Sequence, residues 1–63
     1  MCESTAFLKK NGEEEKLLED VVMLKPQGEK IVLTSILGDT KEVDGVVDHI
    51  DLMNHRIVLR STK

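Results

Sequence analysis

The sequence predicts an all-β fold, a small antiparallel meander that closes into a barrel-like domain. Short segments alternate apolar and polar side chains, which is the period of a half-buried strand. Turn signals recur about every eight to twelve residues, a spacing typical of small all-β sandwiches and barrels. The helix signal is weak throughout. A chain of 63 residues is short for more than one core, so we expect one small β domain over residues 1–63.

The first predicted strand runs from Cys2 to Leu8, where alternate positions change character with a period of two. The segment Lys9–Gly12 ends in Asn-Gly, which readily takes the positive φ angles of a tight hairpin. The charged run Glu13–Lys16 is predicted to be a solvated loop or the start of the next strand.

The segment Leu17–Leu24 fits one face of a helix as well as it fits a strand. The β-branched pair Val21-Val22 favours a strand. The nearby Pro26 and Gly28 also leave little length for a helix. We therefore predict a strand over about Val21–Lys25.

The second half of the chain reads as short strands joined by tight turns. Lys30–Thr34 is a β-rich run with polar ends. Asp44-Gly45 indicates a further turn or bulge. The remaining expected elements are an apolar continuation at 35–37, a turn near Gly38–Thr40, a short strand over Thr40–Val43, and a hairpin of Val46–Leu52 with Arg56–Leu59 around 53–55.

The chain is expected to form a homodimer. A domain of this size buries only about 60% of the surface that its unfolded chain exposes, and Phe7 is the single aromatic residue. The N-terminal strand is the expected edge of the sheet, and an uncovered edge strand is an association site. Pairing there around a twofold axis would bring the two Cys2 residues together.

Cys2 is the one cysteine and follows the initiator methionine. Removal of Met1 is expected when the second residue is small, and Cys2 would then carry a free α-amine and a thiol. These two donors can close a five-membered chelate ring on nickel, copper or zinc, which accept sulfur and nitrogen better than magnesium or calcium do. The alternative is that Cys2 is a small strand residue without a ligand role.

The charge balance argues against nucleic acid as a partner. The net charge is -3, so the chain as a whole lacks the basic footprint of a nucleic-acid-binding protein. No apolar run approaches the roughly 18 residues of a membrane span, and residues 1–8 lack the features of a signal peptide. We expect a cytoplasmic protein, and a lone cysteine fits a reducing compartment.

The two histidines are weaker candidates as metal donors. His49 lies in a predicted strand and His55 at a hairpin tip, and their spacing matches no familiar zinc motif. Their spacing from Cys2 also gives no indication of a nucleophile with an oriented base. The glycines are scattered one per turn rather than grouped in a phosphate-binding loop. We therefore expect that the chain is not an enzyme.

Several stretches together resemble the CooT family of small nickel-binding proteins, some of which are labelled predicted RNA-binding proteins. The resemblance covers nearly the whole chain. It rests on Met1-Cys2-Glu3-Ser4 with Ala6-Phe7-Leu8, Glu19-Asp20-Val21, Ile36-Leu37-Gly38, Val47 with Ile50-Asp51-Leu52, and Ile57-Val58-Leu59.

The resemblance implies a small β-barrel-like homodimer whose metal ligand is Cys2. It also implies a metallochaperone-like role in nickel insertion into an enzyme such as carbon monoxide dehydrogenase. Two thiolates with nitrogen donors from two N-termini would suit square-planar Ni(II), whereas zinc prefers a tetrahedral set. The alternative is a small RNA-binding or protein-interaction module in which Cys2 is incidental, with Lys9, Lys10, Lys25, Lys30 and Lys41 as its basic residues.

Overall fold

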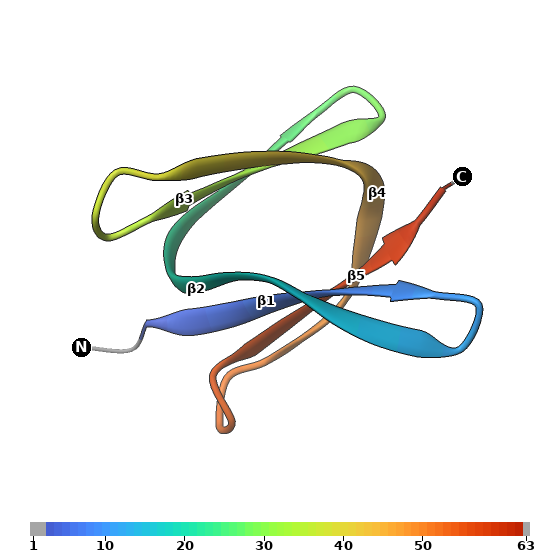
Figure 1. Cartoon of the computed structure of the whole chain (residues 1–63), viewed down its shortest axis with the longest axis horizontal. Helices are drawn as coiled ribbons and strands as arrows, with labels where there is room; N and C mark the ends of the chain where they lie inside the picture. Colours follow the sequence, from blue (N-terminus) through green and yellow to red (C-terminus); the bar gives the residue numbers. More distant parts are fainter. Residues whose placement is uncertain (1–2, 63) are drawn as a thin grey trace.

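The computed structural model describes residues 3–62 and consists of five β-strands joined by short turns (Figure 1). Neighbouring strands in the chain are neighbours in the sheet, and all four consecutive pairs are antiparallel. The predicted all-β antiparallel meander is therefore confirmed. The strands are β1 (Ser4–Lys10), β2 (Glu13–Gln27), β3 (Lys30–Ser35), β4 (Thr40–Asp51) and β5 (Arg56–Ser61).

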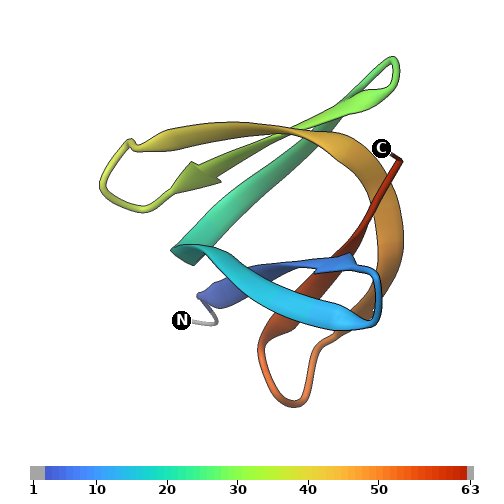
Figure 2. The same cartoon turned by 45° about the vertical axis from the view of Figure 1, so that its right-hand side comes forward.

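The strand pairs form a closed ring, because β5 returns to β1. With five alternating strands the first and last run in the same direction, so the closing pair is parallel. Ala6 lies opposite Ile57, and Leu8 lies opposite Leu59. The expectation that the N-terminal strand is a sheet edge is wrong, since β1 has a hydrogen-bonded partner on each side. Figure 2 shows β1 lying between β2 and β5.

The second strand is longer than predicted. It covers Glu13–Gln27 instead of about Val21–Lys25, so of the two alternatives for the charged run at 13–16, a loop or the start of the next strand, the strand start is confirmed. The Asn11-Gly12 turn, with φ angles of 54° and 81°, sets the antiparallel register. Residues of opposite charge are then placed opposite each other in the register of the two exposed strand ends. These pairs are Lys9 with Glu14 and Lys10 with Glu13.

A bend at Asp20 lets β2 serve two neighbours. Asp20 has a φ of 56°, a left-handed conformation that Asp tolerates better than most residues. Val21 is paired with Ser4 of β1 and also with Ser35 of β3, so the strand changes its partner at this point. The Asp20 carbonyl accepts a hydrogen bond from the Ile36 amide at 2.9 Å. This bond ties the β3–β4 turn to the bend.

The fourth strand continues through Asp44-Gly45, where a turn or bulge was predicted. The prediction is wrong, because the strand does not end there but changes its partner strand from β3 to β5. Asp44 is opposite Lys30 of β3, and Gly45 is opposite Ser61 of β5. A Cβ on Gly45 would lie 2.6 Å from the backbone oxygen of Arg60. Glycine is needed there for close approach of two backbones. The predicted turn near Gly38 and the final hairpin are confirmed.

The interior of the ring is small and aliphatic. Leu33 and Leu59 are fully buried, and partly buried leucines pack around the central cluster. Because side chains alternate along β5, Val58 faces away from this cluster, yet it too is fully buried. The cluster consists of Ala6, Val21, Ile31, Leu33, Ile57 and Leu59.

Phe7 and Arg56 lie on the outer side of the ring. The Arg56 guanidinium lies 4.5 Å from the centre of the Phe7 ring, a cation–π distance, and also pairs with Glu14. Phe7 is opposite Val58 in the closing strand pair. The single aromatic residue thus helps to seal the β1–β5 junction.

Candidate metal centre and the surface beside it

Cys2, the predicted metal ligand, lies outside the described residues. The chain next to it is held by two elements. Ser4 is paired with Val21 of β2, and the Thr5 amide donates a hydrogen bond of 2.9 Å to the His55 carbonyl. Glu3, the first described residue, therefore directly precedes a part of the chain that is fixed between β2 and the β4–β5 turn.

The histidines are placed on two different elements. His49 is in β4, where its Nδ1 lies 2.9 Å from the Asp48 carboxylate. His55 ends the β4–β5 turn with a φ of 55°. Within residues 3–62, no three side chains of the His, Asp and Glu types form a cluster that could hold a metal ion. A donor role for either histidine stays a prediction.

A shallow apolar groove begins at Ser4, the first residue of β1. It has a volume of about 460 Å³ and lies between β2 and the end of β4. Met23 and Ile50 are 56% and 50% exposed, and the groove joins them into one exposed apolar surface. We call it the apolar groove; its lining residues are Ser4, Val21, Val22, Met23, Leu24, Ile50, Leu52 and Ile57.

The groove exists because two strands change partners. Beyond Val21, β2 pairs with β3 alone, and from Gly45 onward β4 pairs with β5 alone. One edge of each strand segment is thus without a ladder partner in the described part of the chain. Two turns also carry exposed apolar side chains, Ile36 and Leu37 after β3 and Leu52 and Met53 after β4, and of these Leu52 lines the groove.

The β4–β5 turn beside the groove is held by Asp51. Its carboxylate accepts a hydrogen bond from the backbone N–H of Asn54 at 3.1 Å and another from the side-chain Nδ2 of Asn54 at 2.8 Å. The bond from the Asn54 side chain is the main cause that lowers the pKa of Asp51 below its usual range, and the backbone bond adds to it. This turn positions the His55 carbonyl that anchors Thr5.

Replacing Asn54 by Ala is expected to raise the pKa of Asp51 part of the way toward its ordinary value of about 3.9. A lowered folded-state pKa gives stability that is present above the unfolded-state pKa and lost as the pH falls through the folded-state pKa. The variant should therefore show a weaker acid dependence of stability below about pH 4. Carboxyl NMR titration measures the shift. The pKa of Asp48, lowered chiefly by His49, should not change; equal shifts at both groups would contradict the assignment.

The sequence did not predict the apolar groove. A local signal was present in the adjacent apolar pairs Val22-Met23 and Leu52-Met53, in which all four side chains are exposed. The pairs lie thirty positions apart in the chain, and only the closed ring brings Met23 and Leu52 into one groove.

No helix within residues 3–62 is long and apolar enough to cross a membrane.

A closed ring of five strands with an open apolar groove defines a small all-β domain. Comparison with known proteins gives the family. The model of the CooT family, described as the CO dehydrogenase accessory protein CooT, matches residues 1–60. The chain belongs to this family, which confirms the resemblance. Because CooT is an accessory protein of carbon monoxide dehydrogenase and not an enzyme, the expectation of a non-enzymatic chain is also confirmed.

Individual proteins support this assignment. A crystal structure of a candidate CooT from Carboxydothermus hydrogenoformans superposes with a TM-score of 0.90 and 34% identity, covering 98% of this chain and 100% of the other. An uncharacterised protein of Archaeoglobus fulgidus is 48% identical over 67% of this chain and 93% of its own length. One from Methanocaldococcus jannaschii is 32% identical over 94% of this chain and 96% of its own. These matches support an accessory role in enzyme maturation.

Proposed function

We propose that the protein binds Ni(II) between two copies of the chain, through the Cys2 thiolates, for maturation of a nickel enzyme such as carbon monoxide dehydrogenase. The observation that supports this proposal best is the position of the apolar groove. Ser4, two residues after Cys2, lies in the wall of the groove. A segment of two residues spans at most about 7 Å.

A second copy is the occupant that fits the groove. A chain of this length has a small core, and burying exposed apolar side chains against a copy of itself would supplement that core. Around a twofold axis each copy contributes the same surface. The two N-terminal segments would then meet at the axis, and each could supply one thiolate and one nitrogen donor to a shared metal ion.

The donor chemistry determines how the cargo is held and released. Thiolate and amine donors in a plane suit Ni(II). The thiol, with an ordinary pKa of about 8.5, and the α-amine, at about 7.7 to 8.0, must both lose protons to bind the ion. Nickel should therefore be released as the pH falls below neutrality. An exchangeable site is what a delivery protein needs.

The RNA-binding alternative gains little from the structure. Of the five lysines that it would use, Lys9 and Lys10 lie together, whereas Lys30 pairs with Glu42 at 3.5 Å on a different strand pair. Single-stranded RNA is usually held by exposed aromatic rings. The ring of Phe7 is already covered by Arg56.

A nickel titration of the Met-trimmed protein, followed by absorbance, tests the proposal. We expect sulfur-to-nickel charge-transfer bands that saturate at one ion per two chains, and we expect Cys2→Ser to lose both bands and binding. Ser keeps the size of the side chain and removes the sulfur. A Cys2→Ser protein that bound nickel like the wild type would make Cys2 incidental and favour a plain protein-interaction module.

A further inference from the structure

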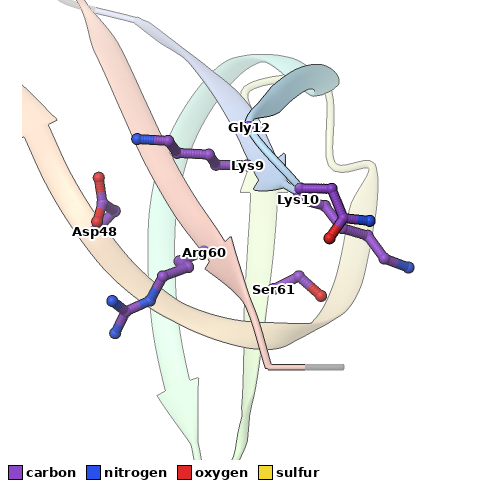
Figure 3. Close-up of a pocket in the computed structure, with 7 residues that line it drawn as sticks. Lys9, Lys10, Gly12, Asp48, Arg60 and Ser61 are labelled. Atoms are coloured by element: carbon purple, nitrogen blue, oxygen red, sulfur yellow. The ribbon is translucent and has the colours of Figure 1, made fainter.

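A second cleft lies at the opposite end of β1 from Ser4. It has a volume of about 320 Å³ and lies between the β1–β2 turn and the end of β5. Three of its residues are cations, Lys9, Lys10 and Arg60 (Figure 3). We call it the basic cleft; its lining residues are Lys9, Lys10, Asn11, Gly12, Asp48, Arg60 and Ser61.

The cations come together because the ring closes. Lys9 of β1 lies opposite Arg60 of β5 in the parallel pair, on the outer side of the sheet. In Figure 3 their side chains extend toward the side on which Asp48 lies, and Lys10 extends the other way. All three cationic side chains are exposed. Residues near the two ends of the chain thus form one positive surface.

The carboxylate in the cleft does not neutralise these cations by direct contact. The Asp48 carboxylate is hydrogen-bonded to the His49 ring at 2.9 Å, and this bond is the main cause that lowers the pKa of Asp48. The charges of Lys9 and Arg60 also lower that pKa, but neither cation forms an ion pair with Asp48 within the described residues. Glu14, which is opposite Lys9 in the β1–β2 ladder, pairs with Arg56 instead. The charged ends of Lys9 and Arg60 are therefore available to an anionic partner.

The charges around the basic cleft would orient an acidic partner. Across the β1–β2 turn, a neighbouring hollow shares Lys10 and Asn11 with the basic cleft and is otherwise lined by Leu8 and three carboxylates, Glu13, Glu14 and Glu15. The chain as a whole carries a net charge of -3. An acidic partner would be repelled by the β2 side of the turn and attracted on the β5 side, and such complementarity fixes orientation and raises the association rate.

We propose that the basic cleft binds an acidic segment of the protein that receives the metal, which presents adjacent carboxylates to Lys9 and Arg60. The inference rests on the proposed delivery function. A segment of a protein fits better than a free small anion, because the lining cations are exposed and each exposed ion pair contributes little by itself. A docked protein adds its other contacts. The cleft also lies away from the apolar groove, so docking leaves that groove open to a second copy.

The test is an amide NMR titration of the full-length ¹⁵N-labelled protein with an oligo-glutamate peptide at low salt. We expect shifts concentrated at Lys9, Lys10 and Arg60 that fade as salt is raised, since screening acts on exposed charges. The variant Lys9→Glu/Arg60→Glu should bind the peptide at least about tenfold more weakly than the wild type does. The matched control is Lys25→Glu/Lys41→Glu, which changes the net charge equally at exposed positions and should bind as the wild type does.

Each contrary result overturns the proposal. These results are no shifts with the wild-type protein, equal weakening in both charge-reversed variants, or tighter binding of an RNA oligonucleotide than of the peptide at the same amides. A nickel titration of Lys9→Glu/Arg60→Glu separates this proposal from the metal-binding proposal, because that variant should still take up nickel. Cys2→Ser should in turn still bind the peptide.

Discussion

The double variant Met23→Glu/Ile50→Glu is expected to be a monomer that no longer holds nickel at one ion per two chains. Both side chains line the apolar groove and are about half exposed. Dimerisation across the groove would bury four carboxylates close to a twofold axis without partners. Burying unpaired charge costs about 3 kcal/mol or more, which corresponds to association at least about a hundredfold weaker.

Sedimentation velocity over a range of protein concentrations measures this effect. The control is Gln27→Glu/Thr62→Glu, which adds the same two charges at exposed positions outside the apolar groove and should leave the dimer intact. If both variants sediment as dimers, a different surface joins the two copies. If the wild type sediments as a monomer in the presence of nickel, the shared site is wrong.

Leu33→Ala is expected to bring the domain close to unfolding. Leu33 is fully buried in the central cluster, and a Leu-to-Ala change at such a site costs about 2–5 kcal/mol. At roughly 0.05–0.15 kcal/mol per residue, a chain of this size has a total stability of only about 3–9 kcal/mol. A single core substitution therefore removes a large part of it.

Urea unfolding followed by circular dichroism measures the loss. Leu37→Ala removes the same atoms from a side chain that is 83% exposed in the β3–β4 turn. Measured at a concentration at which the chains are monomeric, it should cost little. Similar losses for Leu33→Ala and Leu37→Ala would mean that the interior of the ring is not the stabilising core.

The local features of the fold could be predicted from the sequence. Alternation predicted β1, a β-rich run with polar ends predicted β3, and the glycines at 12, 28 and 38 marked three of the turns. The first half of β2 was left open between a strand and other structures, because its charged run carries no hydrophobic period. It is a strand because β1 lies beside it and supplies lysines opposite its glutamates.

The non-local features could not be predicted in the same way. The β1–β5 pair joins residues about fifty positions apart, and no local pattern shows whether an end strand remains an edge. Gly45 looked like a turn residue, but its role depends on the Arg60 backbone that approaches it. The apolar groove and the basic cleft arise from the same closure. Cys2 was identified by its chemistry and its family resemblance, and its role as a ligand stays a proposal.

Native mass spectrometry of the nickel-loaded protein tests the central claim most directly, because it counts chains, metal ions and initiator methionines in one particle. We expect a dimer that carries one nickel ion, with Met1 absent from both chains, and we expect Cys2→Ser to give no nickel-bearing dimer. Nickel bound to single chains, or bound equally well by Cys2→Ser, would contradict a site shared between two Cys2 residues.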